Sequence, residues 1–171
     1  IDNPKSDYRA ENIKISDDST SFVISNNGVK TKAVIPSVGR HNVLNALFAF
    51  AVGRLAGMER EEIVNALLNY RPAGMRQRVI KTKDYTVIAD CYNASPDSMR
   101  AALSVLNELE DVKGRRIAVL ADMLELGEIS KNEHRKIGLY AGTMRIDALF
   151  CCGDLSKSLY EGAAGLANRY H

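Results

Sequence analysis

Tryptophan is absent from this sequence of 171 residues, and only 6% of the residues are aromatic. The net charge is also small, at +2. Proteins that bind nucleic acid hold the phosphates with a strongly basic surface and stack the bases on aromatic rings, so this composition predicts no nucleic-acid partner. No apolar run reaches the roughly 20 residues of a membrane-spanning helix, and we expect no membrane span.

Cysteine is scarce too. Cys91, Cys151 and Cys152 have neither metal-binding nor redox spacing, which indicates reduced thiols and a cytoplasmic location. The sequence also lacks the phosphate-binding patterns Gly-x-x-x-x-Gly-Lys-Ser/Thr and Gly-x-Gly-x-x-Gly, and no metal site is expected in it. Neither a starting Met nor a signal peptide precedes the opening Ile-Asp-Asn-Pro, so we expect a piece of a longer protein, truncated at both ends.

The first part of the chain predicts short strands followed by helices. The strands are expected at residues 12–15, 21–24 and 29–35. Asn27-Gly28 between the last two is a strong hairpin signal. A helix from Asn42 to Gly57 is so apolar that we expect it to be buried nearly all round, and a second helix covers residues 59–69.

Polar side chains nevertheless occupy the first turns of the apolar helix. Asn42 is interpreted as a simple N-cap. For Asn45 we expect a ligand or a specific backbone partner, because a buried polar side chain must find one.

The second part of the chain alternates regularly between strands and helices. Strands are predicted at 85–90, 116–121 and 147–152, and helices at 97–109, 131–143 and 154–168. Such alternation is typical of an α/β fold, a Rossmann-like, mostly parallel sheet flanked by helices. We place the domain boundary near residue 76, which gives domains 1–76 and 77–171.

The polar turn after strand 85–90 is the first candidate site. Asp90 lies at the carboxyl end of that strand, where ligands bind in open α/β sheets and where a carboxylate can accept hydrogen bonds from sugar hydroxyls. Ser95 precedes Pro96 and is a plausible N-cap for the next helix. The alternative is an ordinary strand–turn–helix with a capping acid.

A second polar loop follows strand 116–121. Asp122 and Glu125 lie just past its end, and Ser130 and Glu133 have the spacing of a capping box. His134 shares a helix face with apolar residues, so it is interpreted as a packed or capping histidine.

Basic residues at positions 71, 76 and 78 surround the predicted domain boundary. The planar fork of arginine matches the geometry of phosphate, although a solvated basic linker explains the same pattern.

Four stretches together resemble the Mur ligases of peptidoglycan synthesis. They are Gly39-Arg-His-Asn-Val-Leu-Asn, Gly74-Met-Arg-Gln, Asp90-Cys-Tyr-Asn-Ala-Ser-Pro-Asp-Ser-Met, and Leu120-Ala-Asp-Met-Leu-Glu-Leu-Gly followed by Ser130 and His134. The last two are closest to the member of the family that adds D-alanyl-D-alanine. Ser95 stands where that pattern has Asn, and Ala121 where it has Gly.

The resemblance implies an ATP-dependent amide ligase that joins D-Ala-D-Ala to UDP-MurNAc-tripeptide through an acyl phosphate. Residues 1–76 would end the central ATPase domain, and residues 77–171 would form most of the C-terminal domain. The P-loop and the Mg²⁺ ligands would lie upstream, so we expect this chain alone to be inactive. A monomer in the bacterial cytoplasm is also implied.

The resemblance further assigns residues to two substrates. On the ATP side, Asn45 would contact the adenine, Arg76 a phosphate and Asp90 the ribose, with Asn93, His41 and Asn42 as neighbours. On the dipeptide side it implies Ser95, Asp122, Glu125 and His134.

Two alternatives stay open at this point. Sister ligases that add other amino acids, and the folylpolyglutamate synthases, share the Gly-x-His-Asn-x-x-Asn pattern. The missing P-loop instead favours a non-catalytic nucleotide-binding module.

Overall fold

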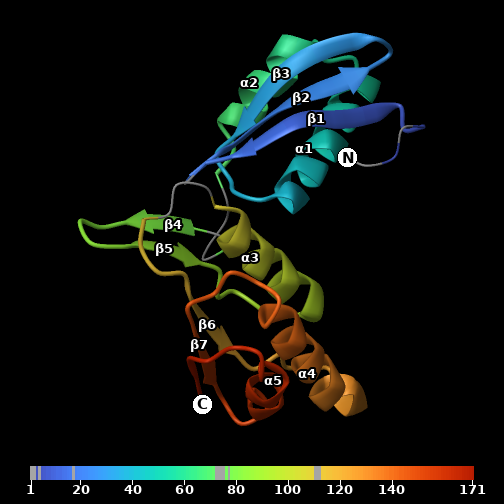
Figure 1. The fold of residues 1–171 in the computed structure, drawn as a ribbon. Coiled ribbons are helices and arrows are strands. Elements are labelled where there is room, and N and C mark those ends of the chain that lie inside the picture. Colours follow the sequence, from blue (N-terminus) through green and yellow to red (C-terminus); the bar gives the residue numbers. More distant parts are fainter. Residues whose placement is uncertain (1–2, 4, 17, 72–75, 77, 110–112) are drawn as a thin grey trace. The chain divides into compact units, whose positions relative to one another are not determined.

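The computed structural model describes residues 3, 5–16, 18–71, 76, 78–109 and 113–171 (Figure 1). The chain divides into two compact units, Ile1–Ala89 and Asp90–His171. This division falls at Ala89, after a hairpin, and the domain boundary near residue 76 stays a prediction.

The first unit is built on a three-stranded antiparallel sheet of β1 (Tyr8–Ile15), β2 (Thr20–Asn26) and β3 (Val29–Ile35). Asn26 pairs with Val29, so Asn27 and Gly28 form a two-residue turn with φ of 50° and 76°. Positive φ at both positions is what the favoured hairpin turn requires. The hairpin predicted from Asn27-Gly28 is therefore confirmed.

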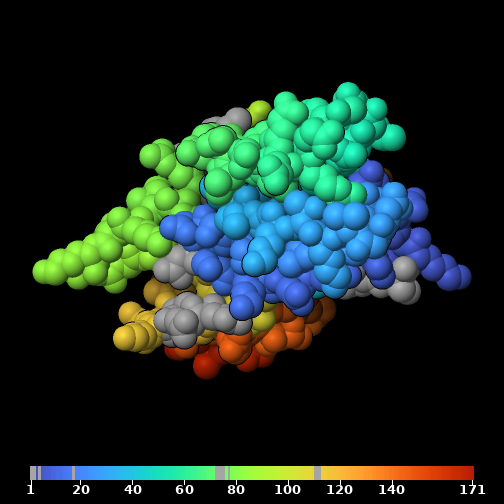
Figure 2. All heavy atoms as spheres, turned by 90° about the horizontal axis from the view of Figure 1, so that it is seen from above, coloured from blue at the N-terminus to red at the C-terminus, as the bar shows by residue number. Residues whose placement is uncertain are grey.

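Two helices, α1 (Arg40–Leu55) and α2 (Arg60–Leu68), cover this sheet. Figure 2 shows the green spheres of these helices lying directly against the blue spheres of the strands. Phe22 and Ile24 of β2 meet Phe50 of α1 and Ile63 of α2 in one buried core.

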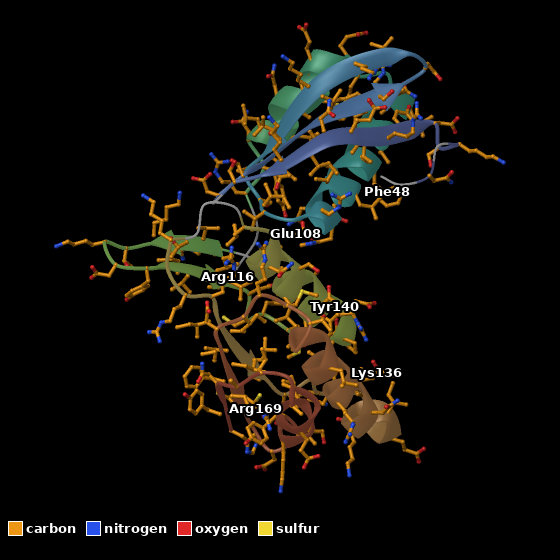
Figure 3. The ribbon with its side chains drawn as sticks, viewed as in Figure 1. Phe48, Glu108, Arg116, Lys136, Tyr140 and Arg169 are labelled. Atoms are coloured by element: carbon orange, nitrogen blue, oxygen red, sulfur yellow. The ribbon has the colours of Figure 1, made fainter. Side chains whose placement is uncertain are left out.

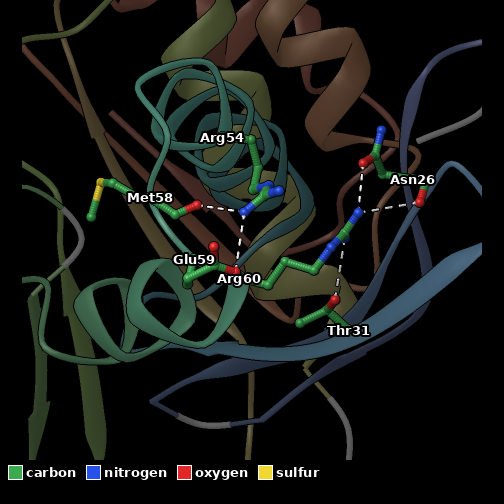
Figure 4. A network of polar contacts seen from close by, with 6 residues as sticks. All are labelled: Asn26, Thr31, Arg54, Met58, Glu59 and Arg60. Carbon is green, nitrogen blue, oxygen red and sulfur yellow. Dashed lines mark hydrogen bonds and ion pairs between the residues drawn. The ribbon is translucent and has the colours of Figure 1, made fainter.

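An arginine network joins α2 to the hairpin and to the end of α1 (Figure 4). Arg60 donates a hydrogen bond to Asn26 Oδ1 at 2.8 Å, and Asn26 is buried. Arg54 donates to the carbonyl oxygen of Met58 and lies 3.7 Å from Glu59. The side chains thereby satisfy polar groups that the packing of helix on sheet would otherwise leave unpaired.

The expectation that the apolar helix is buried nearly all round is wrong. One side of α1 packs on the sheet, and the other side is exposed at Leu44, Phe48 and Val52 (Figure 3 labels Phe48). These residues recur at intervals of four, which places them on one face of the helix. The sheet of β1, β2 and β3 packs against a single face of α1.

Strands β4 (Arg78–Lys81) and β5 (Thr86–Ala89) pair with each other in a two-stranded antiparallel sheet. The Thr82 N–H donates to the Tyr85 carbonyl at 2.9 Å, which closes the turn between them. Strand 85–90 was predicted to lie in the parallel sheet, and that prediction is wrong for the described residues. A neighbour only a short turn away pairs at little cost in loop entropy.

The second unit contains a parallel sheet of β6 (Ile117–Ala121), β7 (Ala148–Cys152) and β8 (Arg169–Tyr170), in that order. Its helices are α3 (Pro96–Glu108), the 3₁₀ turn η1 (Gly127–Ile129), α4 (Ser130–Ala141) and α5 (Lys157–Gly162). Leu103, Met123, Ile137, Leu149 and Leu159 form its core. The predicted α/β class with a helix-flanked parallel sheet is confirmed, although the last helix is shorter than 154–168.

Polar contacts and close backbone approach hold these helices together. The Tyr140 hydroxyl of α4, labelled in Figure 3, lies 2.7 Å from Ser104 Oγ of α3. Between α4 and α5, a Cβ atom built on Gly138 would overlap the carbonyl oxygen of Leu159, and one built on Gly162 would overlap that of Arg135. Glycine at these positions is therefore required by space rather than by backbone angle.

We expect Gly138→Ala to lower the free energy of unfolding of the second unit by about 3 kcal/mol, because the added methyl group meets backbone that cannot rotate away. Gly165→Ala is the matched control, since its Cβ would lie 3.6 Å from the nearest atom, Gly142 O. Denaturant unfolding followed by hydrogen exchange in α4 measures both. Equal effects of the two substitutions would contradict the packing described here.

Candidate functional site

The turn that leads into α3 is fixed by its own side chains. The Ser98 N–H donates to Ser95 Oγ at 3.2 Å, and the Ser95 N–H donates to Ser98 Oγ at 2.9 Å. Pro96 occupies the first turn, where no N–H is needed. The prediction that Ser95 is the N-cap is confirmed, and its hydroxyl is already engaged in this reciprocal cap.

Asp90 and Asn93 lie in the same turn. Asp90 directly follows β5 and is half-buried. Asn93 is exposed, and its Oδ1 accepts a hydrogen bond from the Ala94 N–H at 2.9 Å. Asp90 does follow the carboxyl end of a strand, but that strand belongs to the hairpin and not to the parallel sheet.

The other residues assigned to ATP belong to the first unit. Arg76 is exposed, and its neighbours Gly74, Met75 and Gln77 lie outside the described residues. Whether these residues meet Asp90 and Asn93 around one nucleotide stays a prediction.

The first turn of α1 differs from the prediction. The N-cap is Gly39, with φ of 104°, and Asn42 lies inside the helix and donates to the Val38 carbonyl at 2.9 Å. The prediction that Asn42 is a simple N-cap is wrong, because the glycine takes a conformation that lets the helix begin earlier. Asn45 is exposed rather than buried, and His41 is half-buried.

At the carboxyl ends of β6 and β7, Asp122 binds the loop that follows β7. Its Oδ1 accepts a hydrogen bond from the Ser156 N–H at 2.7 Å. Gly153 has φ of 108°, and a Cβ atom there would collide with the Asp122 carboxylate. Ser156 is buried and donates from Oγ to the Gly153 carbonyl at 2.6 Å. Gly153 and Ser156 are not among the predicted site residues, although glycine directly after a strand is a signal for close backbone approach.

His134 of α4 is fully buried and binds the loop after β6. Its Nε2 lies 2.9 Å from the Met123 backbone nitrogen, and its Nδ1 lies 2.8 Å from the Ser130 carbonyl oxygen. The interpretation of His134 as a packed histidine is confirmed.

The prediction of a capping box formed by Ser130 and Glu133 is wrong. The 3₁₀ turn η1 runs directly into α4, so Ile129 is the N-cap and Ser130 is already helical. Glu133 instead forms an ion pair with Lys136 at 2.6 Å.

The loop between Asp122 and η1 exposes its tip. Leu124 is 65% exposed, Glu125 is also exposed, and Glu125 has a left-handed φ of 62°. Asp122 and Glu125 thus lie in one loop, His134 lies on the helix α4 that follows it, and Ser95 lies at the start of another helix.

Cys91 and Cys152 are exposed, whereas Cys151 is buried. Burial raises the pKa of Cys151 to about 11, so this thiol is protonated near neutral pH and is a poor nucleophile. No group of three or more His, Cys, Asp or Glu side chains among the described residues could hold a metal ion. Within the described part of the chain, no helix has the length and apolarity needed to cross a membrane.

The chain is similar to known ligases in both family and sequence comparisons. The family model for "Mur ligase, glutamate ligase domain" matches residues 75–171. The UDP-N-acetylmuramoyl-tripeptide–D-alanyl-D-alanine ligase of Bacillus subtilis is 37% identical, over 92% of this chain and 34% of its own length. The Escherichia coli enzyme of the same name is 31% identical, over 96% of this chain and 36% of its own length.

Solved structures are similar as well. MurF from Acinetobacter baumannii matches 99% of this chain and 36% of its own chain, with 30% identity and a TM-score of 0.89. The MurF ligase of Thermotoga maritima in complex with ADP has a TM-score of 0.80 at 19% identity, which supports the fold alone. The chain spans about a third of the length of the curated relatives it matches.

We expect Asp122→Ala to lower the free energy of unfolding of the second unit by about 2 kcal/mol, because the Ser156 N–H loses a charged acceptor. Asp122→Asn keeps an acceptor oxygen and should cost less than half as much. Asp154→Ala, an exposed carboxylate in the same loop, is the control. Denaturant unfolding with hydrogen exchange at Ser156 measures all three, and equal losses in the Asp122→Ala and Asp154→Ala variants would refute the assignment.

Proposed function

The chain belongs to the Mur ligase family, and we propose that it is part of an ATP-dependent ligase that joins D-Ala-D-Ala to UDP-MurNAc-tripeptide. The observation that carries this proposal is the 37% identity, across 92% of the chain, to a ligase of that name. The loop Asp122–Gly127, one of the two stretches closest to the D-Ala-D-Ala-adding member, lies at the carboxyl end of β6, where α/β proteins bind ligands.

The proposed reaction has two steps. The terminal carboxylate of the tripeptide attacks the γ-phosphorus of ATP, and ADP leaves. The amine of D-Ala-D-Ala then attacks the acyl carbon, phosphate leaves with the bonding electrons, and the amine loses a proton as the amide forms. Such phosphoryl transfer depends on positioning and charge neutralisation more than on covalent chemistry by the protein.

On the ATP side, we assign Asn45 to the adenine, Arg76 to a phosphate and Asp90 to the ribose, with His41, Asn42 and Asn93 as neighbours. An Asp90 carboxylate can accept hydrogen bonds from two ribose hydroxyls, and an arginine fork can donate two to phosphate oxygens. Magnesium would neutralise phosphate charge, but the described residues offer no cluster of ligands for it. By the family resemblance, we assign its ligands to other parts of a full-length ligase.

On the dipeptide side, we assign Ser95, Asp122, Glu125 and His134 to the surroundings of the dipeptide pocket. Asp122 and His134 already make hydrogen bonds within the protein, whereas Glu125 presents an exposed carboxylate at a loop tip. An exposed carboxylate suits an ammonium group such as that of a dipeptide. We further propose a monomer of the bacterial cytoplasm.

The acceptor preference of the full-length ligase tests the proposed function. We expect D-Ala-D-Ala to be preferred over any single amino acid, including glutamate, by at least about 100-fold in kcat/KM, because differential transition-state binding of about 3 kcal/mol gives that ratio. A preference for a single amino acid would instead assign the full-length protein to the sister ligases or to the folylpolyglutamate synthases. The 171-residue chain alone should show no turnover, and measurable turnover would overturn its assignment as part of a larger active site.

Substitution of Arg76 separates a ligase from a non-catalytic nucleotide-binding module. In the full-length enzyme, Arg76→Ala should lower kcat/KM for ATP about 100-fold, far more than it changes folding stability, since a charge-assisted phosphate contact is lost. Arg71→Ala, an exposed arginine in the same basic segment, is the matched control and should have little effect. If both variants keep the wild-type rate, the phosphate role of Arg76 is wrong.

A further inference from the structure

We propose that His134 is a positioning residue for the acceptor side of the site. As a neutral imidazole it fixes the backbone of the loop Asp122–Gly127 and so sets where the Glu125 carboxylate lies. This inference rests on the proposed function, because Glu125 is assigned there to the dipeptide.

The protonation of His134 follows from its partners. A backbone N–H can only donate, so the Met123 N–H, 2.9 Å away, requires an unprotonated Nε2. The proton of the neutral ring then lies on Nδ1 and is donated to the Ser130 carbonyl oxygen at 2.8 Å. An imidazolium would have no acceptor to offer to Met123, so this arrangement requires the neutral ring.

His134 does not contact a substrate itself. The residue has no exposed surface, and both ring nitrogens are engaged with the backbone of the protein. Its influence on the acceptor therefore passes through Met123, whose side chain is also fully buried.

The loop that Met123 anchors has an unfavourable backbone. Glu125 and Gly127 both have left-handed angles, with φ of 62° and 53°. A left-handed backbone at a residue with a side chain is costly and persists only when its surroundings determine it. Asp122, bound to the Ser156 N–H, and Met123, bound to His134, supply that determination on the side that enters the tip.

Two substitutions of His134 by amide side chains distinguish the effect of its hydrogen bond to Met123 from that of its hydrogen bond to Ser130. In His134→Gln, the amide lies where Nε2 was and can accept from the Met123 N–H. In His134→Asn, the shorter amide can still donate to the Ser130 carbonyl but leaves Met123 without an acceptor. We expect His134→Asn in the full-length ligase to raise KM for D-Ala-D-Ala at least tenfold with KM for ATP within twofold, and His134→Gln to restore most of that loss.

Tyr140→Phe is the control for a purely structural effect. It lies on the same helix and loses the contact with Ser104 Oγ, so it should change stability without changing KM for the dipeptide. Amide exchange at Met123 in the 171-residue chain gives a second readout. It should accelerate at least tenfold in His134→Asn while the Leu149 amide, bonded to the Asn168 carbonyl in the sheet, stays protected.

Each outcome supports or overturns the inference. A dipeptide KM that is unchanged in His134→Asn overturns it, and so does exchange that rises equally at Met123 and Leu149, which would mean general destabilisation. If wild-type ligase uses another acceptor, the proposed function fails on its own, and the same KM comparison is made with that acceptor. Failure of His134→Gln to restore the KM or the Met123 protection also overturns the inference.

Discussion

The second unit depends on how closely the backbone of α4 approaches that of α5. Gly138 and Gly162 allow this approach, because a methyl group on either would overlap a carbonyl oxygen of the facing helix. The helix pair positions two hydrogen-bonding groups that lie far apart in the chain. His134 on α4 binds Met123, and Ser156, directly before α5, binds Asp122. Consecutive residues at the end of β6 are thereby tied to two different helices, which explains how a loop without secondary structure takes a defined path.

Local signals in the sequence were sufficient where a structure depends on neighbouring residues. Asn27-Gly28 specifies its hairpin because both residues tolerate positive φ, and Ser95 caps α3 because Pro96 fixes the first helical turn. The same kind of signal failed at Asn42 and at Ser130. In both cases the helix begins before the apparent cap, once through the left-handed Gly39 and once through a 3₁₀ turn.

Non-local features could not be predicted in the same way. An apolar helix pattern does not state how many of its faces have a partner, so the exposed side of α1 was unforeseen. A strand pattern does not name the strand's neighbour either, and β5 pairs with the adjacent β4 instead of joining the parallel sheet. Asp122 was correctly predicted to lie at a strand end, and His134 was correctly interpreted as a packed histidine on a helix. Their partners are 34 and 11 residues away, so the sequence could not distinguish a ligand contact from an internal hydrogen bond.

The free energies of these interactions explain why the loop Asp122–Gly127 needs more than one hydrogen bond to hold its conformation. A left-handed residue with a side chain costs about 1–2 kcal/mol, and Glu125 is such a residue. A single buried hydrogen bond contributes about 1 kcal/mol net, or about 2 kcal/mol with a charged acceptor such as Asp122. One bond alone would barely offset the conformation at Glu125, whereas Asp122, His134 and the buried Met123 side chain together exceed it. Because each bond supplies a substantial share of this stabilisation, the position of the loop tip is sensitive to either bond. Asp122 and His134, which form hydrogen bonds within the protein, therefore determine the position of the loop tip that carries the exposed Glu125.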